Sequence, residues 1–352
     1  MHNKKILDKV TMIIPTHERH PFLKRVLDYY SDAPFKIIIC DSSKLPFLDF
    51  SQSENMEYIH TPEVGFVSKI SAITGKLVTP YSLMCADDDF ISISGIEKSI
   101  YFLEKNNDYS SAGGRYVDFN IICNEVYCVE GYSYAQYCDI SSDDVSERLK
   151  QVFNPYFPFF YSVHKTATIK KSFPLFDNTM RYKNLRLMEI SFIMVSVIEG
   201  KHKTLPFFYA ARENDNCDEN EGTRAMPHLH EVWEENSYFE EKKTFLIMMI
   251  NHIMNEMNMS KNEAKQAIEN SVNTYITNSL KGHNNNKIVS KIKKYIPNFV
   301  RTLLKVYRSS CFSVKLFKKL HTKYPFNNEV SLPIWLEIEK YIVKYNEEIK
   351  RK

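Results

Sequence analysis

Residues 82–90 read Ser-Leu-Met-Cys-Ala-Asp-Asp-Asp-Phe, a short apolar run followed by three carboxylates. The apolar run is typical of a buried strand, and an open α/β sheet binds its ligands where the carboxyl ends of its strands lie. Three adjacent carboxylates repel one another unless a cation or hydrogen-bond donors compensate them. If the chain stays extended, Asp87 and Asp89 point the same way and can share Mg²⁺ or Mn²⁺. The alternative is a solvated acidic turn.

The residues before this stretch alternate between strand and helix patterns. Apolar strands are predicted at 10–14, ended by Pro15, at 35–40, followed by Asp-Ser-Ser, and at 56–60. Helices are predicted from Phe22 to Tyr30 and from Gly65 to Leu77, because apolar residues recur there at helical spacing. Such alternation predicts an α/β fold with a mostly parallel sheet covered by helices, and it places polar strand ends along one edge.

The rest of the chain differs in character. Residues 111–137 suggest antiparallel strands, a helix is predicted at 188–197, and a last strand at 205–211. Helical periodicity then dominates, at 245–257 and 261–280. We therefore expect a domain over 1–226, with halves of about 10–120 and 121–226, and a helical, basic C-terminal region over 227–352.

Composition limits the class of protein. The chain has 352 residues, of which 43% are hydrophobic and 25% charged, as in globular proteins. Its seven scattered cysteines indicate reduced thiols and a cytoplasmic location. The polar start predicts neither a signal peptide nor an anchor, and no window has the ~18 to 20 apolar residues of a membrane span.

The strand ends and their order resemble the nucleotide-sugar-binding half of the GT-A glycosyltransferases. The motifs are an apolar strand into Pro15-Thr16, then Ile-Ile-Ile-Cys-Asp-Ser-Ser, then a Gly-led helix running into Ala-Asp-Asp-Asp. The resemblance covers about residues 10–120 and is closest to family-2-like enzymes of bacterial surface polysaccharide synthesis, such as capsule or lipopolysaccharide. It implies a glycosyltransferase that moves a sugar from a nucleotide-sugar donor to a glycan or lipid-linked acceptor, in an inverting reaction.

The resemblance also implies roles for individual residues. The donor-binding positions would be Pro15, Thr16, Arg19, Asp41, Lys69, Asp87 and Asp88. Asp41 would contact the base or ribose, Asp87 would lie nearer the ribose, and Asp89, with Asp87, would ligate Mg²⁺ or Mn²⁺. The bound ion would stabilise the charge of the departing nucleoside diphosphate. Where the family usually has Tyr-Asn after Pro-Thr, this sequence has His17-Glu18.

Two further positions are candidates outside the donor half. Glu189 is a lone acid in an apolar helix and is our candidate for the general base that takes the acceptor's proton. Its alternatives are a helix cap or an ion pair with Arg186 or Lys183. His228 or His230 is a candidate for a further metal ligand, and the alternative for both is a surface histidine in an acidic loop.

Residues 281–323 interleave Lys and Arg with apolar residues and lack acids. This pattern predicts either a helical face that is merely solvated or peripheral docking on an anionic inner leaflet. No nucleic-acid-binding motif is present, so nucleic acid is not an expected partner. Two other functions remain open: a sugar-phosphate nucleotidyltransferase, and a membrane- or polyanion-binding protein with a vestigial sugar-nucleotide site.

Overall fold

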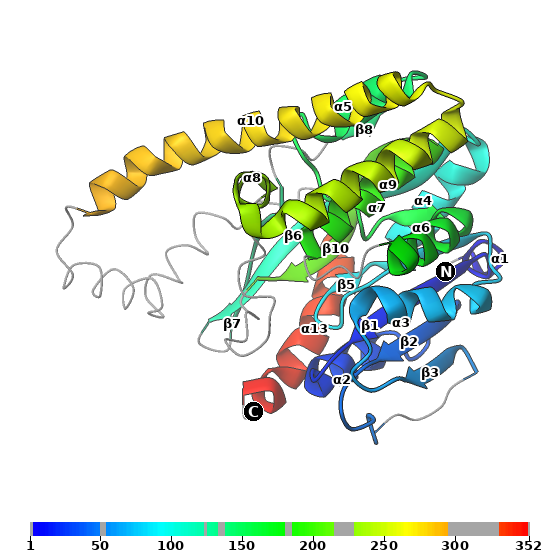
Figure 1. Cartoon of the computed structure of the whole chain (residues 1–352). Coiled ribbons are helices and arrows are strands. Elements are labelled where there is room, and N and C mark those ends of the chain that lie inside the picture. The colour runs from blue at the N-terminus through cyan, green and yellow to red at the C-terminus, as the bar shows by residue number, and fades with distance from the viewer. Residues whose placement is uncertain are drawn as a thin grey trace.

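The computed structural model describes residues 3–49, 54–122, 125–132, 138–179, 185–214, 229–294 and 331–350. The predicted α/β architecture with flanking and C-terminal helices is confirmed (Figure 1). The predicted domain boundary at residue 226 lies outside the described residues and stays a prediction.

Four parallel strands form one half of the sheet, in the order β3-β2-β1-β4. They are β1 (Val10–Thr16), β2 (Lys36–Asp41), β3 (Met56–His60) and β4 (Tyr81–Met84). Runs of buried Ile, Val and Met fill the central strands, as expected where helices cover both faces. Parallel pairing brings the carboxyl ends of these strands to the same edge of the sheet.

The sheet continues through strands from the second half of the chain. Short β9 (Val163–Lys165) runs antiparallel to both β4 and β6 (Tyr109–Ile122), and β6 runs parallel to β10 (Lys201–Glu213). Antiparallel partners then join β10 and β6, namely β5 (Phe90–Ile91), β7 (Glu125–Glu130) and β8 (Asp139–Ile140). The predicted antiparallel strands at 111–137 therefore correspond to β6 and β7. Residues 123–124 and 133–137 of that range lie outside the described residues.

The strand that was expected to end before Pro15 instead includes it. Proline is usually excluded from central strands because it lacks the N–H that the ladder needs. Here the Ile13 carbonyl accepts a hydrogen bond from Cys85 N, just beyond β4, at 2.9 Å. The backbone of Pro15, two residues further along β1, therefore also faces the β4 side. The pairing of β1 with β4 ends at Ile13, so the missing N–H of Pro15 leaves no strand partner unsatisfied.

Helices connect and cover the strands. In the first half these are α1 (Lys4–Leu7), α2 (His20–Tyr29), α3 (Phe66–Ile73, continued by the 3₁₀ turn η1, Thr74–Lys76) and α4 (Ile93–Lys105). In the second half they are α5 (Val145–Val152), α6 (Thr166–Thr179) and α7 (Leu185–Glu199). The helices α3, α6 and α7 pack side by side, and α9 (Phe239–Met257) continues the row (Figure 1).

The C-terminal helices pack on this α/β body. They are α8 (Leu229–Glu234), η2 (Asn236–Tyr238), α9 (Phe239–Met257), α10 (Lys261–Lys294) and α13 (Ser331–Lys350). The last helix, α13, lies against α2 and β7 (Figure 1). There the ring of Trp335 lies 6.3 Å from that of Phe119, and the ring of Tyr341 lies 5.3 Å from that of Tyr29. The buried core thus runs without interruption from the sheet into α13.

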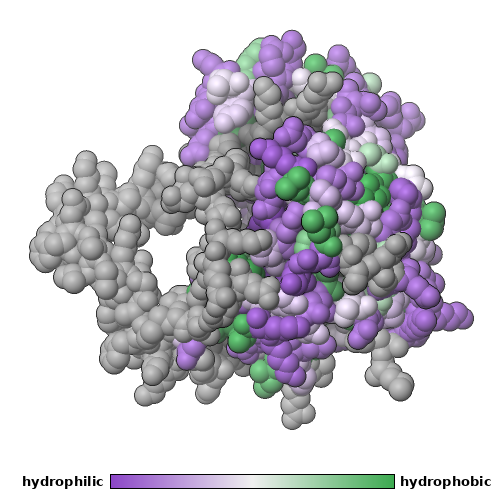
Figure 2. Space-filling model, turned by 90° about the horizontal axis from the view of Figure 1, so that it is seen from below, coloured by the Kyte–Doolittle hydropathy of each residue, from purple (hydrophilic) through white to green (hydrophobic). Residues whose placement is uncertain are grey.

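No helix in the described part of the chain is long and apolar enough to cross a membrane. On the face seen from below, Figure 2 shows hydrophobic residues scattered among hydrophilic ones over the described surface. The four cysteines of the described residues, Cys40, Cys85, Cys128 and Cys138, are free thiols.

A buried polar cluster joins three strands, β6, β9 and β10, to the helix α7. His202 hydrogen-bonds with Ser111 Oγ at 2.9 Å, and His164 with Ser196 Oγ at 3.3 Å. Both imidazoles are fully buried, and that of His202 stacks on Phe159 at 3.8 Å between ring centroids. Burial lowers the pKa of His164 to about 4 and that of His202 well below its usual value. Both side chains are therefore neutral in the native state at neutral pH.

This cluster predicts a loss of stability in mild acid. Unfolded histidine titrates near pH ~6.5, so below that pH the unfolded chain binds protons that native His164 and His202 cannot. The free energy of unfolding should therefore fall from pH 7 to pH 5, by about 2 kcal/mol for His164 alone at ~1.36 kcal/mol per pKa unit. Urea unfolding at several pH values measures this. His164→Gln should flatten the slope, whereas Phe176→Leu, at a buried ring elsewhere in the core, should lower stability equally at every pH. An unchanged slope in His164→Gln contradicts the assignment.

Candidate functional site

Polar side chains gather where β1, β2 and β4 end. Thr16, the last residue of β1, is in register with Asp41, the last residue of β2, and Asp87 to Asp89 follow β4. Thr16 Oγ1 donates to Asp87 Oδ2 at 2.6 Å, so the first and fourth strands are joined directly at this edge. The predicted juxtaposition of the three strand ends is therefore present.

The acidic stretch is a turn, not an extended segment. Asp89 N donates to the Ala86 carbonyl at 3.3 Å, and Asp87 and Asp88 occupy the turn. The condition of an extended chain is therefore not met, and the turn sends the carboxylates toward different partners. Asp87 and Asp88 contact Arg19, whereas Asp89 accepts from the backbone N–H of Glu213 at 3.0 Å.

Arg19 compensates the first two carboxylates. Its guanidinium lies 3.0 Å from Asp87 Oδ1 and 2.6 Å from Asp88 Oδ2, and it covers the Phe22 ring at 4.6 Å. Although burial alone would lower the pKa of Arg19, Asp87 and Asp88 raise it above its usual range. Arg19 therefore stays positively charged next to Asp87 and Asp88.

The negative charge of the turn is nevertheless incompletely balanced. Burial, opposed by Arg19 and aided by Asp88, raises the pKa of Asp87 to about 7. Burial and the Asp88 charge raise the pKa of Asp89 well above its usual value, although Arg212, whose Nε lies 3.9 Å from Asp89 Oδ2, acts against this. An additional cation would favour the ionised form of both groups.

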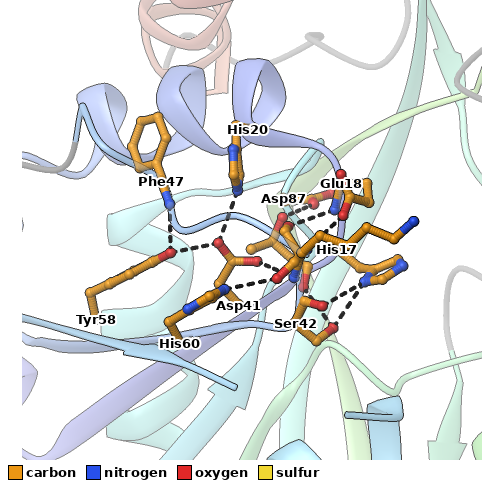
Figure 3. Close-up of polar contacts among 12 residues, drawn as sticks. His17, Glu18, His20, Asp41, Ser42, Phe47, Tyr58, His60 and Asp87 are labelled. Carbon is orange, nitrogen blue, oxygen red and sulfur yellow. Dashed lines mark hydrogen bonds and ion pairs between the residues drawn. The ribbon is translucent and has the colours of Figure 1, made fainter. Parts of the chain in front are cut away.

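Asp41 lies at the centre of a second polar cluster, shown in Figure 3. Its Oδ2 accepts from Tyr58 OH at 2.6 Å and pairs with His20 Nε2 at 2.9 Å, while Oδ1 accepts from Ser43 N at 2.8 Å. Burial alone would raise the pKa of Asp41, but these hydrogen bonds lower it. The carboxylate is fully buried, so in this state it orients His20 and Tyr58 and does not face open solvent.

The loop after β1 is fastened to the loop after β2. Glu18 has a φ of 55°, in the left-handed region that non-glycine residues seldom adopt. This conformation lets Glu18 N donate to Ser43 Oγ at 2.7 Å, while its carboxylate accepts from Lys44 N at 2.7 Å. His17 Nδ1 lies 3.0 Å from the Ser42 carbonyl (Figure 3). The His17-Glu18 pair therefore gives this loop a structural anchor.

Lys69 reaches the same edge from α3. Its ammonium donates to the Thr16 carbonyl at 2.7 Å and to Ser42 Oγ at 3.0 Å. Burial lowers its pKa, with Cys40 and Asp87 acting against the shift. Lys69 thus joins the ends of β1 and β2. Its predicted contact with the nucleotide-sugar donor stays a prediction.

A cavity of about 300 Å³ lies beside the acidic turn. Its walls are mainly aromatic and include Tyr116, Tyr132, Phe160 and Tyr161, with Arg186, Glu189 and Arg212 as charged groups. Arg212 connects the cavity to the turn, because it approaches Asp89 and hydrogen-bonds to Tyr132.

Glu189 faces this cavity from the second turn of α7. It pairs with Arg186 at 3.2 Å, as the structural alternative expected, and accepts from Tyr156 OH at 2.9 Å. It does not cap the helix, because α7 begins four residues earlier, at Leu185. The other expected partner, Lys183, lies outside the described residues.

No protein-family model matches the sequence, and no curated protein matches it. Among solved structures, S. aureus TarS 1–349 in complex with UDP-GlcNAc matches with a TM-score of 0.51 at 12% identity, over 97% of this chain and 92% of that one. The same TarS segment in complex with UDP matches with a TM-score of 0.42 at 10% identity, over 97% and 91% of the two chains. The first match decides the fold. This chain has a GT-A-like fold.

In this GT-A-like fold the carboxylates of the acidic turn are chemically suitable ligands for a divalent cation, but they do not form a complete coordination site by themselves. Among the described residues, no three His, Cys, Asp or Glu side chains gather as a metal site. Mg²⁺, however, is commonly held by one or two carboxylates together with substrate phosphates. Asp87 and Asp89 supply carboxylates of that kind. His228 lies outside the described residues, and His230 lies in α8 with its side chain not described.

Several site residues escaped the sequence analysis. His20, Tyr58 and His60 surround Asp41 and Ser43, and Arg25 contacts the backbone of the acidic turn. Tyr58 and His60 were detectable, because residues two apart on a strand share a face. Arg25 gave no local signal, since its contact with Glu213 spans 188 residues of sequence.

Arg19→Met should destabilise the protein by about 3 kcal/mol, the low end for breaking a buried ion pair, because Asp87 loses its partner. Adding Asp87→Asn should recover only part of this loss, since it removes the more buried of the two carboxylates that lose Arg19 and leaves Asp88. Lys24→Met, an exposed pair on the same helix, should change stability by less than about 1 kcal/mol. Urea unfolding measures all four proteins. Equal losses in the single and double variants would refute the charge-compensation account.

Proposed function

We propose that this protein is a metal-dependent glycosyltransferase that moves a sugar from a nucleotide-sugar donor to a glycan or lipid-linked acceptor. One observation carries the proposal. The ends of β1, β2 and β4 bring Thr16, Arg19, Asp41 and the acidic turn to one edge of the sheet, beside a cavity that is lined by the Glu189 carboxylate. Open α/β sheets bind nucleotides at this edge.

The donor proposed first is a uridine diphosphate sugar, because TarS, which shares the fold, has been solved with UDP-GlcNAc. Pro15, Thr16, Arg19, Asp41, Lys69, Asp87 and Asp88 would form its binding site. Arg19 is suited to the diphosphate, since a guanidinium binds phosphate oxygens in a planar fork. The sugar would then point toward the aromatic cavity.

Asp87 and Asp89 would hold Mg²⁺ or Mn²⁺ together with the donor diphosphate. Such an ion, when bound, stabilises the negative charge that develops on a departing nucleoside diphosphate. Arg19 stays protonated and adds positive charge on the same side. His228 or His230 remains a candidate additional ligand.

Glu189 is the proposed general base. In an inverting transfer the acceptor hydroxyl oxygen bonds to the anomeric carbon as the bond from that carbon to the diphosphate oxygen breaks. The hydroxyl proton passes to the Glu189 carboxylate, and the electron pair of the broken bond leaves with the nucleoside diphosphate. Tyr156 and Arg186 fix the carboxylate at 2.9 and 3.2 Å, and the aromatic walls limit the access of competing water.

A binding and turnover screen tests this function. Mn²⁺ with one nucleotide sugar should raise the melting temperature of the wild type, since a ligand of the native state stabilises it by RT ln(1 + [L]/Kd). Asp89→Ala should lose that shift. Glu189→Gln should keep it but lose turnover by roughly 10²- to 10⁴-fold, the usual contribution of a general base. Glu147→Gln, an exposed acid on α5, is the control.

Three results would count against the proposal. Full turnover in Glu189→Gln would remove its catalytic role. Release of pyrophosphate from a nucleoside triphosphate and a sugar phosphate would favour a nucleotidyltransferase. No stabilisation by any nucleotide would favour a binding protein without transferase activity.

The basic segment 281–323 suits a cytoplasmic enzyme that docks on an anionic inner leaflet to reach a lipid-linked acceptor. Each basic residue near such a surface contributes on the order of 1 kcal/mol. The side chains of this segment lie outside the described residues, so the proposal rests on sequence.

Sedimentation with vesicles tests the docking. The protein should bind phosphatidylserine vesicles at low salt, release them as salt rises, and ignore phosphatidylcholine vesicles. Replacing Lys315, Lys318 and Lys319 with Gln should weaken binding at least tenfold, whereas Lys265→Gln on α10 should not. Equal binding to neutral vesicles, or no binding to anionic ones, would show that the basic face is only solvated.

A further inference from the structure

Behind the acidic turn, Arg25 on α2 forms an ion pair that is almost completely removed from solvent. Its side chain is 0% exposed, and that of Glu213, the last residue of β10, is 6% exposed. Arg25 Nη2 donates to Glu213 Oε2 at 2.5 Å and to the Asp88 carbonyl oxygen at 2.9 Å. One nitrogen thus connects a helix, a strand end and the backbone of the acidic turn.

This ion pair is a poor device for stability alone. Among the described residues, Arg25 Nε and Nη1 have no hydrogen-bond partner, although both are buried. The guanidinium instead lies between the rings of Phe22 and Phe90, at 5.4 and 5.2 Å. Buried ion pairs with unmet donors are often no more stabilising than apolar residues of similar size. A role other than stabilising the fold would explain why the chain keeps this buried ion pair.

Several contacts of the pair fix the geometry of the turn. Arg25 holds the Asp88 carbonyl from behind, while Arg19 holds the Asp87 and Asp88 carboxylates from the front. Glu213 fixes the guanidinium with its carboxylate and orients Asp89 with its backbone N–H. Phe90, directly after the turn, pairs with Ala211 on β10. The carboxylates of the turn are therefore aimed by groups that lie far from the turn in sequence.

We infer that Arg25 and Glu213 are positioning residues, which orient Asp88 and Asp89 toward the donor diphosphate and its cation. The inference rests on the proposed function, because it assumes that the acidic turn binds the donor. Neither side chain need touch the donor. Removing the pair should change donor binding much more than it changes folding.

The double variant Arg25→Met/Glu213→Leu separates the two roles. It replaces both charges with apolar groups of similar size and leaves no buried charge unpaired, so it should melt within a few degrees of the wild type. The backbone N–H of Glu213 is retained. We expect Kd for the Mn²⁺–UDP-sugar complex, measured by calorimetry well below the melting temperature, to rise at least tenfold. Arg25→Met alone should melt much lower, because Glu213 is left without its cation.

Two further variants keep the inference falsifiable. Arg25→Lys preserves the charge, but its ammonium group does not reach as far as Nη2, so the folded protein should bind the nucleotide-sugar donor at least threefold more weakly, even if the double variant does not fold. Ile338→Ala, in the buried face of α13, should lower the melting temperature without changing Kd. Wild-type affinity in Arg25→Lys or in a folded double variant overturns the positioning role. Loss of affinity in Ile338→Ala would show that donor affinity follows stability alone, which also overturns it. If the wild type binds no nucleotide, the proposed function fails first, and the inference fails with it.

Discussion

The arrangement of the candidate site depends on how the three adjacent carboxylates of the acidic turn are compensated. Arg19, at the start of α2, pairs with Asp87 and Asp88, and Arg212 on β10 approaches Asp89. Arg25, on α2, donates to the Asp88 carbonyl oxygen. Because repulsion among the carboxylates grows as water is excluded, the acidic turn is tolerable only with this helix in place. The start of α2 is in turn fixed by Glu18, whose left-handed conformation lets the loop bond to Ser43. Electrostatics and loop geometry are thus parts of the same constraint.

The compensation is partial, and that has chemical meaning. Asp41, which receives three hydrogen bonds, has a lowered pKa, whereas Asp87 and Asp89 have raised ones. The two clusters share an edge but have opposite electrostatic characters. The Asp41 cluster is satisfied by protein donors and is suited to hold neighbouring side chains in place. The acidic turn is short of compensating positive charge, so a cation bound there would favour the ionised forms of Asp87 and Asp89.

The sequence predicted the donor half of the fold well because its signals are local. Alternating apolar strands and amphipathic helices place β1 to β4, and β3 begins and ends at the predicted residues. Signals failed where tertiary contacts override local preference. Pro15 stays within a central strand because the neighbouring strand has already ended, and α6 was not expected, since it contains Pro174 in its interior. Similarly, the acidic stretch turns because Arg19 and Glu213 draw successive carboxylates apart, and neither partner is adjacent in sequence.

The same distinction explains which site residues sequence could reveal. Thr16, Arg19, Asp41 and the acidic turn follow strand ends, a position that any α/β reading singles out. Arg25 has no such marker, because an arginine in an amphipathic helix is an ordinary feature. Glu213 does end a strand, but nothing in the sequence indicates that it pairs with Arg25. Only burial distinguishes them: a fully enclosed guanidinium, with one nitrogen shared between a carboxylate and a carbonyl of the acidic turn. Burying such a pair costs free energy that apolar residues would not cost. A role in orienting other groups would account for that cost. The groups that the pair contacts in the acidic turn are the backbone of Asp88 and the carboxylate of Asp89.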